Sequence, residues 1–218
     1  MAKEIEIDDN KIVELYMNAC LLNKDNLSSV YAFCNYYEFE ESKFYEYFTS
    51  FEALEMHIFK LFFTQTQSVL MNSKQYEAYD PKHKLLSFYY TFFELLTANR
   101  SFVVLKLKES KNKLEIIKKM QSLKEAFKLY VKELGIEKVD FKNDKINKLQ
   151  DSSMSNLAWL QLISILKFWI DDTSTKFEKT DVFIEKSVKA GFDVMNIAPV
   201  KSVFDLAKFL WKEKGAMS

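Results

Sequence analysis

Apolar residues recur along most of the chain at the three- and four-residue spacing that places side chains on one face of a helix. This spacing predicts ten helices, over residues 11–22, from Ser28 or Ser29 onward, and over 40–48, 50–71, 80–98, 102–108, 112–134, 144–170, 180–196 and 199–214. Only 3 Gly and 2 Pro occur in 218 residues, whereas β sandwiches and barrels need frequent turn residues. The sequence therefore predicts an all-α fold class.

The helix predicted over 112–134 illustrates how a buried face is inferred. Its apolar residues form one stripe that we expect to point inward: Leu114, Ile117, Leu123, Phe127 and Val131. Gly135 follows at the position where a left-handed glycine commonly ends a helix. In the helix over 50–71, the same reasoning places Val69 on the buried side.

The stretch from residue 27 to residue 54 predicts two short helices, a tight turn between them and the beginning of a longer helix. Ser28 or Ser29 can cap the first short helix by accepting a hydrogen bond from its opening turn. The second would bury Phe44 together with Tyr47 or Phe48. This is the outline of a helix-turn-helix.

A ten-residue pattern within this stretch carries a family resemblance. The sequence reads Tyr-x-x-Phe-x-Ser-x-Glu-x-Leu, with Tyr45, Phe48, Ser50, Glu52 and Leu54 at the fixed positions. It resembles the end of the recognition region in the TetR family of bacterial transcriptional regulators. The resemblance implies a helix-turn-helix domain over 1–49 and a helical ligand-binding and dimerisation domain over 50–218. It also implies a homodimeric regulator that responds to a small effector.

The same resemblance implies a set of DNA-contacting residues. They are Ser28, Glu41, Ser42, Lys43, Tyr45, Tyr47 and Ser50. At the turn, Tyr37 and Glu38 replace the family's usual small residue and Gly. Because a non-Gly residue in the left-handed conformation costs about 1–2 kcal/mol, a remodelled turn is expected.

Charge changes the expectation of DNA binding. Residues 1–56 contain 4 lysines and 12 acidic residues, a balance of −8, and residues 57–218 carry the compensating +8 because the whole chain is neutral. Glu40 and Glu41 stand where the family faces the major groove, and Phe51 replaces the Lys that usually meets a phosphate. Phosphate neutralisation supplies much of the affinity for DNA, so weak or atypical DNA binding is expected.

The resemblance further implies an apolar effector pocket and a subunit interface, although core packing is the commoner role for any one aromatic residue. Tyr and Trp would add hydrogen-bonding groups to the otherwise apolar pocket, and a lipid-like or aromatic ligand would suit it. The candidate lining residues are Phe88, Tyr89, Phe92, Phe93, Phe102, Trp159, Phe168 and Trp169. The candidate dimer residues, on the helices over 144–170 and 180–196, are Leu162, Leu166, Phe183 and Phe192.

Signatures of catalysis and metal binding are absent from the sequence. We find no Gly-rich phosphate loop, no Gly-x-Ser-x-Gly elbow and no paired Cys or His at metal-ligand spacing. Cys20 and Cys34 fit small buried residues in a reducing cytosol. We therefore expect a cytoplasmic protein that is not an enzyme, with no catalytic residue, no metal and no cofactor.

The helix predicted over 199–214 leaves two alternatives open. The segment Val200–Trp211 has an apolar stripe opposite several lysines, which is typical of helices at a membrane surface and also of helices that pack on their own domain. A lipid-binding accessory protein of ubiquinone biosynthesis uses the TetR fold with an aromatic pocket and such a helix, without binding DNA. That protein is similar in plan and gives an alternative function. A protein-interaction module that uses the acidic N-terminal domain is a third.

Overall fold

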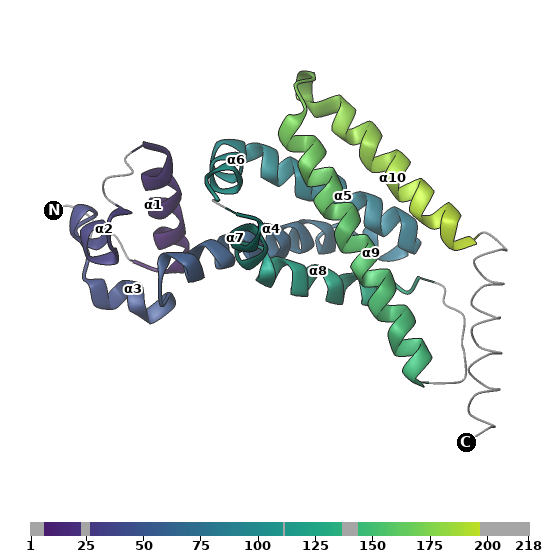
Figure 1. Ribbon diagram of the computed structural model, residues 1–218, viewed down its shortest axis with the longest axis horizontal. Coiled ribbons are helices and arrows are strands. Elements are labelled where there is room, and N and C mark those ends of the chain that lie inside the picture. The colour runs from purple at the N-terminus through teal and green to yellow at the C-terminus, as the bar shows by residue number, and fades with distance from the viewer. Residues whose placement is uncertain (1–6, 23–26, 111, 137–143, 197–218) are drawn as a thin grey trace. The chain divides into compact units, whose positions relative to one another are not determined.

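The computed structural model describes residues 7–22, 27–110, 112–136 and 144–196, and the regular structure of these residues is entirely helical (Figure 1). The α-helices are α1 (Asp9–Leu22), α2 (Val30–Tyr36), α3 (Glu41–Tyr47), α4 (Phe51–Met71), α5 (Pro81–Ala98), α6 (Arg100–Glu109), α7 (Lys113–Lys119), α8 (Gln121–Glu133), α9 (Asp144–Asp171) and α10 (Glu178–Asn196). Short 3-10 helices η2 (Tyr76–Ala78) and η3 (Thr175–Phe177) precede α5 and α10. The all-α fold class is confirmed. The helix predicted over 199–214 lies outside the described residues.

Local capping explains where several helices begin and end. The backbone N–H of Lys11 donates to the Asp8 carboxylate at 2.7 Å, and that of His83 donates to the Asp80 carboxylate at 2.9 Å. Pro81 then opens α5, at a position where its missing N–H removes no helical hydrogen bond. Gly135 lies beyond α8 with φ of 71°, as its sequence position predicts.

The single helix predicted over 112–134 is wrong, because the chain is interrupted at Met120. The φ and ψ angles of Met120 are −93° and 4°, and its N–H bonds to carbonyls of α7 before α8 begins. The interruption buries Met120 and leaves Leu114 and Ile117 of α7 75% and 54% exposed, so their predicted inward orientation is also wrong. Val69, in the last turn of α4, is likewise exposed rather than buried.

The chain forms two compact units. The first contains residues 1–66 and 92–126, and the second contains residues 67–91 and 127–218. Helices α1 to α3 therefore share a unit with α6, α7 and parts of α4, α5 and α8. The domain boundary after residue 49, inferred from the family pattern, stays a prediction.

Phe33 of α2 is the centre of the core around the helix-turn-helix. Its side chain is fully buried. Its ring centroid lies 5.1–6.3 Å from the rings of Tyr16, Tyr37, Phe39, Phe44 and Phe51. Edge-to-face pairs of this kind add to the stabilisation from burial. Phe48 is also buried whereas Tyr47 is exposed, which settles the alternative left by the sequence.

The second unit has its own aromatic core, formed by α5, α8 and α9. Phe88 and Tyr89 of α5 lie 5.3 Å and 6.1 Å from the ring of Phe127. Trp159 of α9 lies 6.3 Å from the same ring. The Tyr89 hydroxyl donates to the side-chain oxygen of Gln161 at 3.1 Å, which gives its buried polar group a partner. Helix α10 packs along α9 within this unit (Figure 1).

Candidate functional site

The turn between α2 and α3 has the geometry of a helix C-terminal cap with a left-handed residue. Glu38 adopts φ of 58°. Its N–H donates to the Asn35 carbonyl at 3.4 Å, and the Phe39 N–H donates to the Cys34 carbonyl at 3.1 Å. This pair of hydrogen bonds defines a Schellman motif, and the contact between Phe33 and Phe39 is its usual apolar companion. The turn is thus formed with Glu38 in the place of Gly, instead of being remodelled as expected.

Replacing Glu38 by Gly is expected to stabilise the protein by about 0.5–1 kcal/mol. Gly relieves the left-handed conformation, which costs about 1–2 kcal/mol for other residues, but it also loses more backbone entropy on folding. Urea unfolding followed by circular dichroism measures the change. Glu46→Gly within α3 is the control and should destabilise by about 1 kcal/mol. A loss of stability in Glu38→Gly would contradict the assignment of strain to Glu38.

The exposed side of α3 holds most of the residues predicted to contact DNA. Ser42 and Lys43 are exposed, as is Ser28 ahead of α2. Tyr45 and Tyr47 are 52% and 45% exposed. Ser50 has a structural role, because its hydroxyl accepts from the Ala53 N–H at 3.2 Å and caps α4. Ser29, one residue after Ser28, caps α2 in the same way.

This face is acidic, and its polar groups are engaged with one another. The Lys43 ammonium lies 3.0 Å from the Glu46 carboxylate, and the hydrogen bond to Glu46 raises the pKa of Lys43. The Tyr45 hydroxyl donates to Glu41 at 3.3 Å. Glu40 is exposed beside them. Three carboxylates around one lysine give α3 and its N-cap a negative potential, which disfavours approach to a phosphate backbone.

Phe51 replaces the phosphate-binding Lys of the family pattern and belongs to the core. Its ring centroid lies 5.2 Å from Tyr16 and 5.8 Å from Phe44. A position that contributes charge in the family therefore contributes packing in this chain.

A buried ionic network occupies the interior of the first unit, and sequence reasoning did not find it. The Glu55 carboxylate of α4 accepts from the Tyr16 hydroxyl of α1 at 2.6 Å. The ammonium groups of Lys106 (α6) and Lys119 (α7) lie 2.9 Å and 3.0 Å from its two oxygens. Lys106 also donates to the Tyr16 oxygen at 3.1 Å. Four helices are thus joined through one carboxylate. The only sequence signal was a Glu and a Lys on otherwise apolar helix faces.

The network changes the ionisation of its members. Burial alone would raise the pKa of Glu55, but hydrogen bonds from Tyr16 and Lys106 lower it below its ordinary value. Burial alone would lower the pKa of Lys106, but the bond to Glu55 raises it. Burial raises the pKa of the Cys20 thiol nearby. Glu55 and Lys106 are therefore both charged at neutral pH, and each charge stabilises the other in place of the water lost on burial.

The eight aromatic residues predicted to line an effector pocket divide between the two units. Phe92, Phe93 and Phe102 are buried in the first, where the Phe102 ring lies 6.4 Å from that of Tyr16. Phe88, Tyr89 and Trp159 surround Phe127 in the second unit. Because the eight residues belong to two units, their role in ligand binding stays a prediction.

Phe168 and Trp169 of α9 differ in burial. Trp169 is fully buried, whereas Phe168 is 36% exposed and stacks on Phe183 of α10 with centroids 4.7 Å apart. Both stacked rings line an open cavity of about 500 Å³ at the connection between the two helices. Asp172 fixes that connection, because its carboxylate accepts from the Ser174 and Thr180 backbone N–H groups and hydroxyls. Although burial opposes it, these bonds lower the pKa of Asp172 to about 2.

The four predicted dimer residues are placed unevenly. Leu162 and Leu166 are buried within the chain itself, so they have almost no surface left for a partner. Phe183 and Phe192 are half-buried. Other apolar residues of α9 and α10 are exposed by 48–65%: Leu157, Leu160 and Val182. These residues provide exposed apolar surface on the two helices where the dimer interface is predicted.

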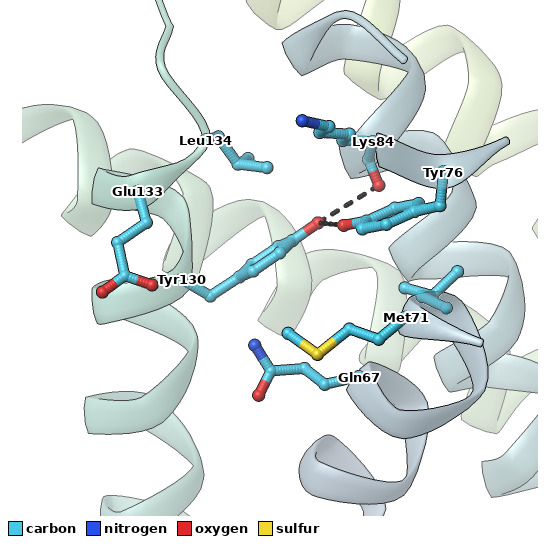
Figure 2. A pocket seen from close by; sticks show the side chains of 8 residues that line it. Gln67, Met71, Tyr76, Lys84, Tyr130, Glu133 and Leu134 are labelled. Atoms are coloured by element: carbon cyan, nitrogen blue, oxygen red, sulfur yellow. Dashed lines mark hydrogen bonds between the residues drawn. The ribbon is translucent and has the colours of Figure 1, made fainter. Parts of the chain in front are cut away.

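A second cavity, of about 170 Å³, lies where the end of α4, η2, the start of α5 and the end of α8 meet within the second unit. It is lined by Gln67, Leu70, Met71, Tyr76, Lys84, Tyr130, Glu133 and Leu134 (Figure 2). The two tyrosine hydroxyls lie 2.7 Å apart at its wall. None of the eight predicted pocket residues lines it. The signal available in the sequence was Tyr76 in a polar loop and Tyr130 on the apolar face of its helix.

These observations define a class of protein: an all-α chain whose helix-turn-helix precedes a larger helical region in sequence. Residues 84–210, more than half of the chain, match the family model described as "Tetracyclin repressor-like, C-terminal domain". The chain belongs to the tetracycline-repressor-like (TetR) family, which is a family of transcriptional regulators. No curated protein matches the chain.

The described helices contain no segment that is both long enough and apolar enough to cross a membrane. The segment Val200–Trp211, considered above for membrane contact, lies outside the described residues.

Proposed function

We propose that the protein is a homodimeric transcriptional regulator that binds DNA atypically and responds to a small apolar or aromatic effector. The observation that carries this proposal is the helix-turn-helix itself. Its turn retains the hydrogen bonds of a Schellman motif even though Glu38 occupies the left-handed position. It also lies ahead of a C-terminal region that matches the family model.

We propose that the exposed residues of α3 contact DNA, and that nearby carboxylates weaken this binding. Ser42, Lys43, Tyr45 and Tyr47 are accessible to a groove or to phosphates. Glu40 and Glu41 at the start of the helix repel the same phosphates. Ser28, Glu41 and Ser50 are proposed to contribute less to DNA binding. The Ser50 hydroxyl already caps α4, and the Glu41 carboxylate repels phosphates.

The double replacement Glu40→Gln and Glu41→Gln is expected to raise DNA affinity at low salt at least tenfold, because two negative charges leave the α3 face. Fluorescence anisotropy with a labelled duplex from the region upstream of the protein's own gene measures the change. Glu185→Gln, at an exposed position of α10, is the control and should leave affinity unchanged. If neither wild type nor the double variant binds DNA at low salt, the regulator proposal fails.

The homodimer is proposed to form through the exposed apolar residues of α9 and α10. Leu157, Leu160 and Val182 supply the surface that Leu162 and Leu166 cannot, and stable interfaces are built on such apolar centres. Native mass spectrometry of the purified protein tests this, since it reports the oligomeric state and any retained ligand together.

A second candidate function is supported by the acidic face of α3. A lipid-binding accessory protein of this fold, peripheral to a membrane, would need no positive groove-facing surface. Absence of DNA binding together with a co-purified lipid would favour this alternative. DNA binding that responds to the double variant would exclude it as the main function.

A further inference from the structure

The cavity beside Tyr76 and Tyr130 has a size that restricts its occupant. Typical small-molecule pockets measure about 300–1,000 Å³, whereas this one measures about 170 Å³. A cavity of about 150 Å³ is sufficient to hold a benzene ring. The space therefore has the size of one aromatic ring with a small substituent.

The two tyrosine hydroxyls form a hydrogen-bonded chain. The Tyr130 hydroxyl lies 3.2 Å from the Lys84 backbone carbonyl, to which it donates. In that arrangement, the bond of 2.7 Å between the tyrosines is donated by Tyr76. Figure 2 shows the two hydroxyl groups next to each other, below that carbonyl. Because the Tyr76 hydrogen is used in that bond, the Tyr76 oxygen can accept a hydrogen bond from a ligand but cannot donate one.

The environment holds this arrangement in place. The Tyr130 ring packs against Phe88, with centroids 4.8 Å apart and planes inclined by 31°. Burial raises the pKa of Tyr130, and it also raises the pKa of Tyr76. Both hydroxyls therefore stay protonated at neutral pH.

Two opposite charges border the cavity. Glu133 of α8 and Lys84 of α5 both line it (Figure 2). Their charges cancel, so the lining has no net charge that would select an ionic ligand. The remaining walls are Leu70, Leu134, the thioether of Met71 and the amide of Gln67, and the apolar ones favour an aromatic ring.

We propose that this cavity binds a neutral single-ring aromatic molecule with one hydrogen-bond donor, of the phenol class, which donates to the Tyr76 oxygen. None of the eight residues predicted to line an effector pocket lines this cavity. Binding does not depend on the proposed function. Only the consequence, that such a molecule acts as the effector, rests on it.

The test compares phenol with anisole, its methyl ether, which keeps the ring but has no donor. Isothermal titration of the full-length protein is expected to show saturable phenol binding and at least tenfold weaker anisole binding. Tyr76→Phe should weaken phenol at least tenfold and leave anisole unchanged. The control Tyr79→Phe changes an exposed hydroxyl of the same loop and should alter neither.

A second variant tests the cavity without changing either tyrosine. Met71 is 68% exposed, so Met71→Trp should fold normally and fill the cavity, abolishing binding of both probes. Equal affinity for phenol and anisole, no saturable phenol binding, or phenol affinity unaffected by Tyr76→Phe would each overturn the proposal. A phenol that binds here without altering DNA affinity would instead contradict the effector role alone.

Discussion

Replacing Glu55 by Gln is expected to lower the free energy of unfolding by about 3–5 kcal/mol. The substitution keeps the shape of the side chain but removes the charge shared by Lys106, Lys119 and Tyr16. Removing one partner from a buried ionic group leaves the remaining charges without compensation, which costs about this much. Chemical denaturation followed by circular dichroism measures the difference. The exposed control Glu94→Gln should change stability by less than about 0.5 kcal/mol.

The same network predicts a pH dependence with a definite sign. The pKa of Glu55 is lowered in the folded state, so its contribution is present above the ordinary value of 4.5 and is lost as the pH falls through the folded value. The pKa of Lys106 is raised, so its contribution is present below 10.5 and is lost as the pH rises through the folded value. The gap between wild type and Glu55→Gln should therefore be widest between these limits. A gap independent of pH would contradict an ionic origin.

Replacing Phe33 by Ala is expected to destabilise the first unit by about 3–5 kcal/mol, the range typical of a large aromatic removed from a core. Five rings contact Phe33, and they come from α1, α3, α4 and the turn after α2. None of them can fill the space without a shift of its backbone. The expected result is loss of cooperative unfolding in the helix-turn-helix, measured by thermal denaturation and by amide protection across α1 to α3.

Tyr31→Ala is the matched control for Phe33→Ala. Tyr31 lies on the same helix but is 66% exposed, so its removal should cost less than about 1 kcal/mol. Similar losses in the two variants would show that α2 contributes through helix propensity instead of through its buried ring.

Most helices were predictable because their apolar residues recur at helical spacing and several also begin or end at a capping residue. Asp80 with Pro81 and Gly135 are read locally, and the structure places all three where their chemistry requires. The interruption at Met120 was not predictable, because no Gly or Pro marks it and both flanking segments favour helix. It arises from tertiary packing, in which Met120 is buried while Leu114 and Ile117 face outward.

The candidate sites were predictable only where the signal is local. The exposed residues of α3 follow from a short motif, so their positions could be read from the sequence. The pair Tyr76 and Tyr130 joins residues 54 positions apart, and the partners of Glu55 come from three other helices. Contacts between residues so far apart in sequence depend on the angles at which the helices cross. The spacing of apolar residues along one helix does not specify those angles. Leu162 and Leu166 show the same limit, since an apolar stripe does not reveal whether it faces its own core or a partner.

The distance along the chain between the partners of the buried network also bears on how the protein folds during synthesis. Tyr16 and Lys106 are separated by 90 residues, and Lys119 follows later still. While the ribosome has completed only α1 to α4, the carboxylate of Glu55 has neither of its ammonium partners and stays hydrated. The nascent helix-turn-helix therefore cannot close its interior around that group until α6 and α7 have emerged. Domains often fold in the order of their synthesis, but in this chain the first segment made reaches its final packing late.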